Sequence, residues 1–352
     1  MKVLVINPGS TSTKIAIYEK ETPVYTQSIN HSVEDLAHFH HVLDQLDYRM
    51  NIIHDILEDA GYHISELDAV SARGGFTKPV VAGTYVVDEN VVDTMKHSPV
   101  HEHASNLGPL LAWELTKGTD VPAFFVDPVS VDELTDVARV TGFNGMNRRS
   151  MFHALNHRST ARKAAEMLGK TYDTCNFVVA HMGGGVTAVA HKQGRAVDLF
   201  NLYDEGCFAM DRGGALPVYQ LIDYCFSGMS KEEVIKTIST KAGVYSYLGT
   251  KDFKSVVDRA FDDNDEAAML IFKAMAYQLA KNIGSLAAVL EFDVDAIVLT
   301  GGMAYSERLV AEIKKYVEKI APVMVLAGEN ELLSLAQGAL RVLNGEEEAR
   351  IY

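Results

Sequence analysis

The sequence lacks long apolar runs and any excess of positive charge. Nothing in its 352 residues approaches the roughly 20 consecutive apolar residues that cross a bilayer. The formal net charge is −15, so the chain as a whole has no attraction to nucleic acid or to an anionic membrane. We therefore expect neither as a partner, and any phosphate site must be a local cluster of donors.

Cysteine is scarce, and no signal peptide is expected at the N-terminus. The chain contains only Cys175, Cys207 and Cys225, an odd number without a C-x-x-C pair. This usage predicts buried, reduced thiols in a cytoplasmic protein and not a disulfide framework. The N-terminus, MKVLVINPGS, predicts a strand and a turn, and it lacks the length and cleavage site of a signal peptide.

Low-complexity linkers are also absent, although the chain is too long for one comfortable core. We therefore expect two closely joined domains. The remaining composition, with 47% hydrophobic and 22% charged residues, is typical of a globular protein.

Hydrophobic periodicity predicts strands and helices throughout the chain. Residues 33–60 carry an apolar residue every three or four positions and predict one helix, which Gly61 ends. Residues 264–290 predict a long helix that is apolar on nearly all sides and therefore central and covered. Other helices are expected at 89–95, 107–116, 159–168, 215–226, 231–239, 305–318 and 331–344. Strands are expected at 2–6, 14–18, 23–29, 67–75, 121–128, 177–181, 186–192, 193–200, 295–302 and 322–328.

One internal repeat is visible. VLVINPGSTSTKIAIY aligns with FVVAHMGGGVTAVAHK, strand on strand and turn on turn. Asn7 then falls on His181, Gly9 on Gly183 and Thr13 on Thr187. Such a match favours a duplicated α/β domain with a cleft between the copies, although two β-hairpins can also match by chance.

Three glycine-rich turns follow apolar strands, in NPGSTSTK, HMGGGVT and LTGGMAYS. Glycine lets backbone N–H groups approach anionic oxygens, and the hydroxyls and Lys14 of the first turn add donors. None matches the P-loop pattern. A single turn of this kind is more often just a tight turn, but three in one chain, two at equivalent positions of a repeat, favour phosphate binding.

Several cationic and acidic side chains stand near these turns. Arg73 and Arg212 lie beside glycines, which suits a bidentate grip on a phosphoryl group; a surface ion pair is the alternative. His153 lies four residues before His157, a spacing that suits a metal pair, but no third ligand is spaced to complete it. We interpret His153 as a donor to an anion. Asp127 ends a strand, where it either holds Mg²⁺ or makes an Asp-Pro turn.

Taken together, these motifs resemble the acetate kinase family, and most closely its butyrate kinase branch. NPGSTSTK, ARGGF, HASNLG, FVDP, FHALNH, HMGGG, LTGG and ENELLSLAQGAL occur in the family's order and at similar spacing. The resemblance implies an α/β fold of two duplicated ribonuclease H-like (actin-like ATPase) domains with a nucleotide cleft between them. We expect an N-terminal domain at 1–155 on the acyl-substrate side, a nucleotide-side domain at 156–331, and a C-terminal helix at 332–352 that packs back on the first.

The resemblance also implies roles for individual residues. Catalytic roles fall on Arg73, Asp127, His153 and Arg212. Nucleotide and phosphate binding falls on Asn7, Ser10, Ser12, Lys14, His181, Gly183, Gly184, Gly185, Gly301 and Gly302. The acyl pocket is expected at Ala72, His103, Asn106 and Phe152, and Mg²⁺ at Asp127 and Glu331.

The sequence departs from the acetate kinase pattern at three places. Val70 stands where that family has an arginine, so Arg73 is expected to take over the carboxylate contact. Gly184 stands where it has an asparagine. Ala72 stands for a pocket valine, and the extra room favours an acid longer than acetate, at roughly 0.8 kcal/mol for each methylene that fills it.

We therefore expect a Mg²⁺-dependent phosphoryl transfer between ATP or ADP and a short-chain carboxylate or acyl phosphate, with butyrate or a branched short-chain acid as the substrate. Acetate and propionate are alternative substrates. A sugar kinase of the same superfamily and a non-catalytic, actin-like nucleotide switch are alternative functions. A homodimer or higher homo-oligomer is expected.

Overall fold

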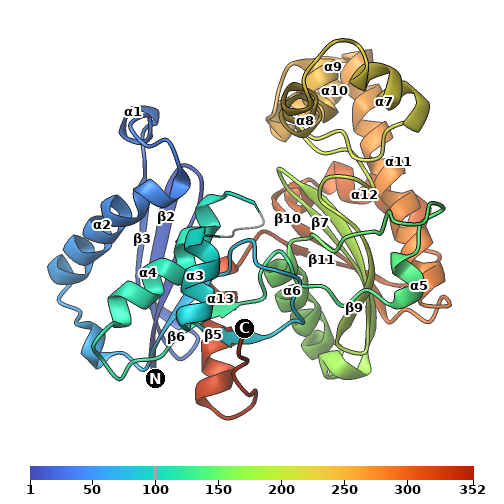
Figure 1. The fold of residues 1–352 in the computed structure, drawn as a ribbon. Helices are drawn as coiled ribbons and strands as arrows, with labels where there is room; N and C mark the ends of the chain where they lie inside the picture. The colour runs from blue at the N-terminus through green and yellow to red at the C-terminus, as the bar shows by residue number, and fades with distance from the viewer. Residues whose placement is uncertain (98–100) are drawn as a thin grey trace. The chain divides into compact units, whose positions relative to one another are not determined.

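The computed structural model describes residues 1–97 and 101–352 (Figure 1). Contacts divide the described chain into two compact units. The first comprises residues 1–132, 154–156 and 330–352, and the second comprises 133–153 and 157–329. The segment 133–153 therefore lies with the second unit, although the expected domain boundary was residue 155. It is held there by a hydrogen bond from Thr135 N to Val197 O and by an ion pair between Arg148 and Asp198.

The first unit is built on a six-stranded sheet in the order β3-β2-β1-β4-β6-β5. Its strands are β1 (Lys2–Pro8), β2 (Ser12–Glu19), β3 (Thr22–Asn30), β4 (Ala69–Arg73), β5 (Thr84–Val86) and β6 (Ala123–Val126). Its helices are α1 (Val33–Leu36), α2 (Leu46–Asp59), α3 (Glu89–His97), α4 (Leu107–Thr116) and α13 (Glu331–Leu343), with 3₁₀ turns η1 (Val42–Gln45), η2 (Ile64–Glu66) and η3 (Ala104–Asn106).

Both faces of this sheet are covered, because alternate strand residues point to opposite sides. One face, with Leu4 and Ile6 of β1, packs against α2 and α4. The other, with Val3 and Val5, packs against α13. The C-terminal helix 331–343 thus packs on the first unit, and Gly338 makes this close approach possible, since a Cβ there would lie 2.5 Å from Val126.

The second unit has a five-stranded sheet in the order β11-β10-β7-β8-β9. Its strands are β7 (Asn176–Met182), β8 (Val186–Lys192), β9 (Arg195–Phe200), β10 (Ala296–Gly301) and β11 (Val323–Ala327). Its helices are α5 (Asp136–Arg139), α6 (Ala154–Met167), α7 (Val218–Cys225), α8 (Lys231–Thr240), α9 (Gly243–Leu248), α10 (Phe253–Phe261), α11 (Glu266–Val289) and α12 (Glu307–Val317), with η4 (Tyr172–Thr174) and η5 (Gly302–Tyr305). Residues 154–156 of α6 group with the first unit.

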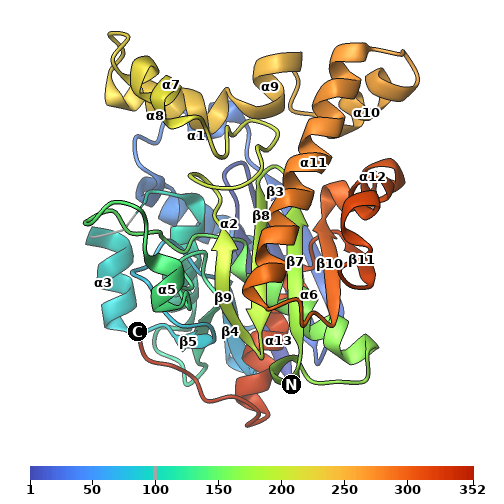
Figure 2. The ribbon, with the colours of Figure 1, turned by 90° about the vertical axis from the view of Figure 1, so that its right-hand side faces the viewer.

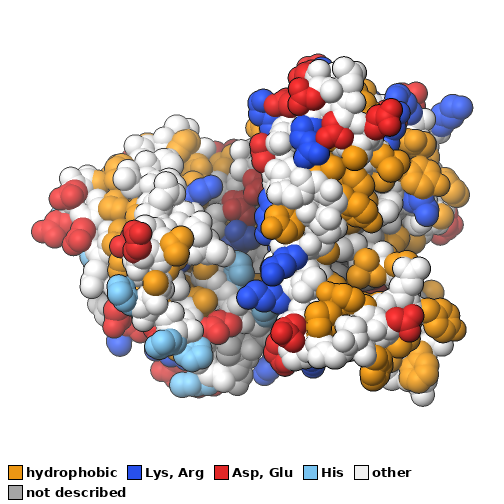
Figure 3. Space-filling view, turned by 90° about the horizontal axis from the view of Figure 1, so that it is seen from above, with side chains coloured by type: hydrophobic (Ala, Val, Ile, Leu, Met, Phe, Trp, Pro, Cys, Tyr) orange, Lys and Arg blue, Asp and Glu red, His pale blue; other side chains and the backbone are white. Residues whose placement is uncertain are grey.

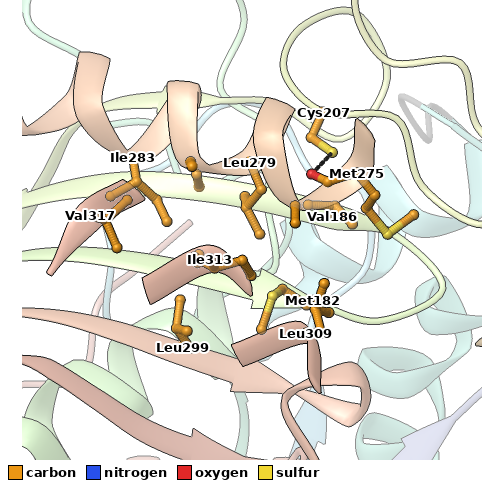
Figure 4. Close-up of a cluster of buried hydrophobic side chains, with 14 of the residues drawn as sticks. Met182, Val186, Cys207, Met275, Leu279, Ile283, Leu299, Leu309, Ile313 and Val317 are labelled. Carbon is orange, nitrogen blue, oxygen red and sulfur yellow. Dashed lines mark hydrogen bonds between the residues drawn. The ribbon is translucent and has the colours of Figure 1, made fainter. Parts of the chain in front are cut away.

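The long helix α11 crosses one face of this sheet (Figure 2), as its all-round apolar sequence predicts. Figure 4 shows Leu279 and Ile283 of α11 facing Leu299 of β10 and Ile313 of α12. The opposite face, with Phe177 and Val179, packs against α6. The central strands β7 and β10 are consequently buried along their whole length.

The strand orders confirm the predicted duplication. In each unit one strand, β1 or β7, is bordered on one side by the two strands that follow it in sequence, each antiparallel to the one before (β2 and β3, or β8 and β9). On its other side lie two parallel strands (β4 and β6, or β10 and β11). The two hairpins differ by one residue: Lys14 pairs with Asn7, whereas Thr187 pairs with His181. By strand pairing Thr187 therefore takes the place of Lys14 and not of Thr13, because the second turn is one residue shorter.

Two expectations from the sequence were wrong, and some short elements were not predicted. Residues 33–60 form α1, η1 and α2, because the carboxylate of Asp44 accepts a hydrogen bond from the backbone N–H of His41 at 2.9 Å and begins a new helix there. Strand β5 and helices α5, α9 and α10 were not predicted. Cys225 is exposed, while Cys175 and Cys207 are buried as expected.

The surface of the second unit mixes charged side chains with apolar ones (Figure 3). Helix α7 has no buried residue, and Val218, Tyr219 and Ile222 are exposed on it. Within the described residues, no helix combines the length and apolar character that a membrane span needs.

Candidate active-site residues

The β1–β2 turn is held from beneath by a buried arginine. Gly9 N donates to Ser12 O at 2.7 Å, which closes the turn. Nη1 of Arg49, from α2, donates to Gly9 O and Ser12 O at 3.0 Å each and to Thr13 Oγ1 at 2.9 Å. Ser10 and Lys14 are exposed and Ser12 is half-buried, so the predicted phosphate donors lie on the outside of a turn whose inside is tied to Arg49.

Three predicted residues meet at the carboxyl ends of β1 and β4. Nδ2 of Asn7 donates to Glu331 Oε2 at 2.7 Å. Arg73 Nη1 lies 3.1 Å from Glu331 Oε1 and 3.4 Å from Asn7 Oδ1. Glu331 is the first residue of α13, where a carboxylate also meets the favourable end of the helix dipole. The structure thus brings an expected metal ligand, an expected catalytic arginine and an expected phosphate contact into one cluster.

Asp127 follows β6 and has a strained backbone. Its φ is +38°, a conformation that non-glycine residues adopt rarely and usually where function or packing requires it. Its Oδ1 accepts a hydrogen bond from Gly83 N at 2.8 Å. Among the described residues no group of three or more His, Cys, Asp or Glu side chains has metal-binding geometry.

The expected acyl-pocket residues of the first unit support its backbone. Asn106 Oδ1 accepts from Phe76 N, and its Nδ2 donates to His101 O, both at 2.8 Å. Nδ1 of His103 accepts from Ser105 N at 3.1 Å, and its ring lies 5.6 Å from that of Phe76. Ala72 is fully buried in the apolar cluster between β4 and α4. Their part in an acyl pocket stays a prediction.

The β7–β8 turn of the second unit is supported by histidines. Thr187 Oγ1 lies 2.9 Å from His153 Nδ1 and 2.9 Å from His157 Nε2, so one hydroxyl links the two rings. His153 also stacks on His181, with 3.9 Å between ring centroids. Phe152, the residue before His153, is buried and packs edge-on against the ring of His157.

Arg212 lies against the tip of the same turn. A Cβ placed on Gly185 would be 2.5 Å from Arg212 Nη1 and 3.2 Å from His153 Cε1. The guanidinium also lies over the ring of Tyr203, 5.2 Å from its centroid. The absence of a side chain at Gly185 thus lets a cation and an imidazole approach one stretch of backbone, an arrangement suited to a phosphoryl oxygen.

A pocket of about 530 Å³ lies beside these residues in the second unit. It is lined by Gly183, Gly184, Met210, Lys251, Asp252, Phe253, Lys254, Val257, Gly302, Met303, Tyr305 and Ser306. Gly301 has φ +87° and leaves no room for a Cβ, which would lie 2.4 Å from Met182 O. Three predicted nucleotide residues, Gly183, Gly184 and Gly302, therefore line a hollow with both apolar and cationic walls.

Behind the turn lies a row of buried rings. His157 and His191 are fully buried and stack at 5.8 Å, and Nδ1 of His191 lies 2.7 Å from the Tyr172 hydroxyl. Burial lowers the pKa of His157 well below its usual value, and it lowers the pKa of His191 to about 3. Both rings are therefore neutral at pH 7. His181 Nε2 lies 3.2 Å from Glu329 Oε1.

Sequence reasoning missed two residues that hold the turns. Arg49 sits in a helical pattern that gives no sign of its burial. Thr187 was noted only as part of the repeat. In both cases the signal lies in long-range contacts, between residues 49 and 9 and between residues 187 and 153.

Comparisons with known sequences identify one family. The model of the acetokinase family matches residues 2–344. Butyrate kinase 1 of Clostridium acetobutylicum is 46% identical over 353 residues, which cover 100% of this chain and 99% of that protein. Two solved structures share the fold. The acetate kinase of Porphyromonas gingivalis has a TM-score of 0.81 at 20% identity, with 97% and 99% of the chains covered. A propionate kinase of Francisella tularensis has a TM-score of 0.76 at 18% identity, with 96% and 98% covered.

Proposed function

Because this chain belongs to the acetokinase family, we propose that it transfers a phosphoryl group between ATP and a short-chain carboxylate, with butyrate as the preferred acid. The observation that carries the proposal is the full-length similarity, at 46% identity, to a butyrate kinase. The resemblance inferred from the sequence motifs alone is confirmed at the level of the family.

The cationic side chains of the two units suit phosphoryl transfer to a carboxylate. A carboxylate is already ionised at pH 7, so the acceptor needs no general base. The protein must align two anionic groups, the carboxylate and the transferred phosphoryl group, and offset their repulsion in the transition state. Arg212 and His153, both against Gly185, are positioned to do this in the second unit, and Arg73 in the first.

We assign the nucleotide to the pocket beside Gly183, Gly184 and Gly302. Phe253 and Tyr305 offer ring surfaces to an adenine, and Lys251 and Lys254 offer charge to phosphates. His181 supports the turn through its contact with Glu329. The carboxylate is assigned to Arg73, with Ala72, His103, Asn106 and Phe152 as acyl-pocket residues.

Mg²⁺ is the expected metal, and the acidic residues of the first unit fit it. Magnesium keeps several waters and needs only one or two protein carboxylates, so a cluster of three acids is not required. Glu331 and Asp127 would hold it, directly or through water. The bound ion would neutralise phosphate charge, while Arg73 and Asn7 fix the orientation of the Glu331 carboxylate.

The proposal is tested by a hydroxamate assay with ATP, Mg²⁺ and unbranched acids from two to six carbons. We expect the highest kcat/KM with butyrate and a loss of about 100-fold in kcat for His153→Ala. A maximum at acetate or propionate would identify an acetate or propionate kinase instead. ADP release with a sugar but with no acid would favour the sugar kinase. Nucleotide-dependent assembly without transfer to any acid would favour the switch.

Two further expectations belong to this proposal. The scarce, unpaired cysteines and the use of ATP suit a cytoplasmic enzyme. The exposed apolar residues of α7 suit a homodimer or higher homo-oligomer, which light scattering of the purified protein would measure.

A further inference from the structure

Arg49 is the most deeply buried charge of the first unit, and all its contacts are with neutral oxygens. Its side chain is 0% exposed. Nη1 donates to Gly9 O, Ser12 O and Thr13 Oγ1, while Nε and Nη2 donate to Gln45 Oε1 at 3.1 and 2.8 Å. One guanidinium thus joins α2 to both ends of the β1–β2 turn.

No carboxylate among residues 1–97 and 101–352 makes a hydrogen bond or ion pair with this guanidinium. Other arginines with little exposure do have such a partner. Arg148 lies 2.7 Å from Asp198 Oδ1, and Arg158 lies 3.7 Å from Glu133 Oε2. Burial lowers the pKa of Arg49 to about 10, and the group is still charged at pH 7.

A buried cation without a counter-ion is costly, and proteins usually pair it or expose it. Here the positive charge lies directly under a turn that carries Ser10, Ser12 and Lys14 on its outer side. An anion on the outer side would supply the missing negative charge through a medium of low dielectric, where the attraction is stronger than in water. The uncompensated charge therefore points to a ligand, and not only to packing.

We propose that Arg49 is a positioning residue with two effects: its hydrogen bonds fix the shape of the Gly9–Thr13 turn, and its uncompensated charge strengthens the binding of a phosphate-type anion on that turn. The inference rests on the proposed function for the identity of the anion, which is the phosphoryl group of the acyl phosphate or its product. It assigns to a buried helical residue a share of the affinity that the exposed donors of the turn would otherwise supply alone.

The decisive variant is Gln45→Glu. It places a carboxylate where Gln45 Oε1 already accepts two hydrogen bonds from Arg49, so the guanidinium keeps its position while its charge is compensated. We expect an unchanged or higher melting temperature, together with about tenfold weaker binding of inorganic phosphate and an equal rise in KM for butyryl phosphate, with little change in kcat. The backbone amide of Gly9 in ¹⁵N-labelled protein reports binding at this turn.

Gln27→Glu is the matched control, because it adds the same charge on the exposed face of β3 in the same unit. Solvent screens that charge, so phosphate affinity is expected to stay within twofold of wild type. If Gln45→Glu binds phosphate as tightly as wild type, the charge has no role and the proposal is wrong. If both variants weaken binding equally, the effect is one of net charge, and the proposal is again wrong.

If Gln45→Glu does not fold, Arg49→Lys and Arg49→Gln test the proposal in its place. Arg49→Lys keeps the charge but loses the planar fork, so we expect phosphate affinity nearer to wild type than that of Arg49→Gln. Equal affinity in the two variants would contradict the charge effect. If the wild-type protein phosphorylates no acid, the proposed function fails, whereas the phosphate titrations at Gly9 still test Arg49.

Discussion

The two glycine turns of this protein occupy equivalent places in duplicated sheets, yet they are supported by opposite chemistry. Beneath the β1–β2 turn lies Arg49, a permanent charge bonded to backbone carbonyls. Beneath the β7–β8 turn lie His157 and His191, two rings that burial keeps neutral. In the second unit the charge is instead supplied from the outside, by Arg212 against Gly185.

The difference shows that duplication preserves topology more strictly than it preserves electrostatics. In each turn a threonine hydroxyl joins the strand to its support: Thr13 Oγ1 lies 2.9 Å from Arg49 Nη1, and Thr187 Oγ1 lies 2.9 Å from His157 Nε2. Both turns use a threonine hydroxyl, although Thr13 and Thr187 do not stand at equivalent strand positions, and the partner decides whether the interior of the turn is charged.

The largest effect is expected from Gly185→Ala. The new Cβ would lie 2.5 Å from Arg212 Nη1 and 2.5 Å from Leu202 Cδ1, and the ends of both flexible side chains would have to move away. Displacing a catalytic cation by about 1 Å costs on the order of 100-fold in kcat, while the melting temperature should change little. Steady-state kinetics and thermal unfolding measure the two quantities.

Gly184→Ala is the comparison for that variant: a Cβ there has no neighbour within 4 Å in the described structure and would face the proposed nucleotide pocket, so its effect should fall on the KM for ATP. Its loss of kcat should be at least tenfold smaller than that of Gly185→Ala. Equal losses in the two variants would mean that Arg212 does not depend on the space at Gly185.

Thr187→Val should have the next largest effect. It removes the hydroxyl shared by His153 and His157 and leaves a fully buried ring nitrogen without a partner, at a cost of about 1–3 kcal/mol in the free energy of unfolding. Because His153 loses its orienting bond, kcat should fall about tenfold. Thr187→Ser, which keeps the hydroxyl, should retain most of the wild-type stability and most of the wild-type kcat. A serine variant as impaired as the valine variant would show that the methyl group matters and the hydroxyl does not.

The neutral histidines predict a dependence of stability on pH. His157 and His191 have lowered pKa values in the folded protein, so below the unfolded value of about 6.5 the unfolded chain binds more protons than the folded one. The stability that the neutral rings contribute is fully present above pH 6.5 and falls as the pH drops below it, at up to about 1.4 kcal/mol per pH unit for each ring; for His191 the loss continues to a pH of about 3. Urea unfolding at pH 7, 6 and 5 measures the slope, and His191→Gln should make it shallower. An unchanged slope would exclude His191 as a cause.

The smallest effect is expected from Gly9→Ala. A Cβ at Gly9 would meet Ser12 Oγ at 3.4 Å, an ordinary contact, and the residue does not have a positive φ. Stability should therefore change by no more than about 0.5 kcal/mol, as judged by thermal unfolding. A large loss would mean that the first turn is as crowded as the second.

Local patterns predicted most of the elements that carry the site. Strands 2–6, 177–181 and 295–302 were visible because central strands that are buried on both faces are continuously apolar. The break between α1 and α2 was not visible, because a hydrogen bond between Asp44 and a backbone N–H decided it against the helical spacing of 33–60. Strand β5 is only three residues long, too short to show a periodicity.

The residues of the candidate site were also predictable only in part. Asn7, Arg73 and Glu331 were predicted one by one from their motifs, and the fold brings them together across up to 324 positions of sequence. Gly183 and Gly302 were predicted and line one pocket. Ala72 is buried between β4 and α4, and its place in the wall of an acyl pocket stays a prediction.

The sequence by itself determined the family, the duplicated α/β architecture and the identity of the glycine turns, because these depend on apolar periodicity and on the order of short motifs. Only the tertiary structure decided what lies beneath each turn. Burial and the presence or absence of a counter-ion are properties of neighbours that are distant in sequence, and no local pattern distinguishes a buried Arg49 from an arginine on the surface of a helix.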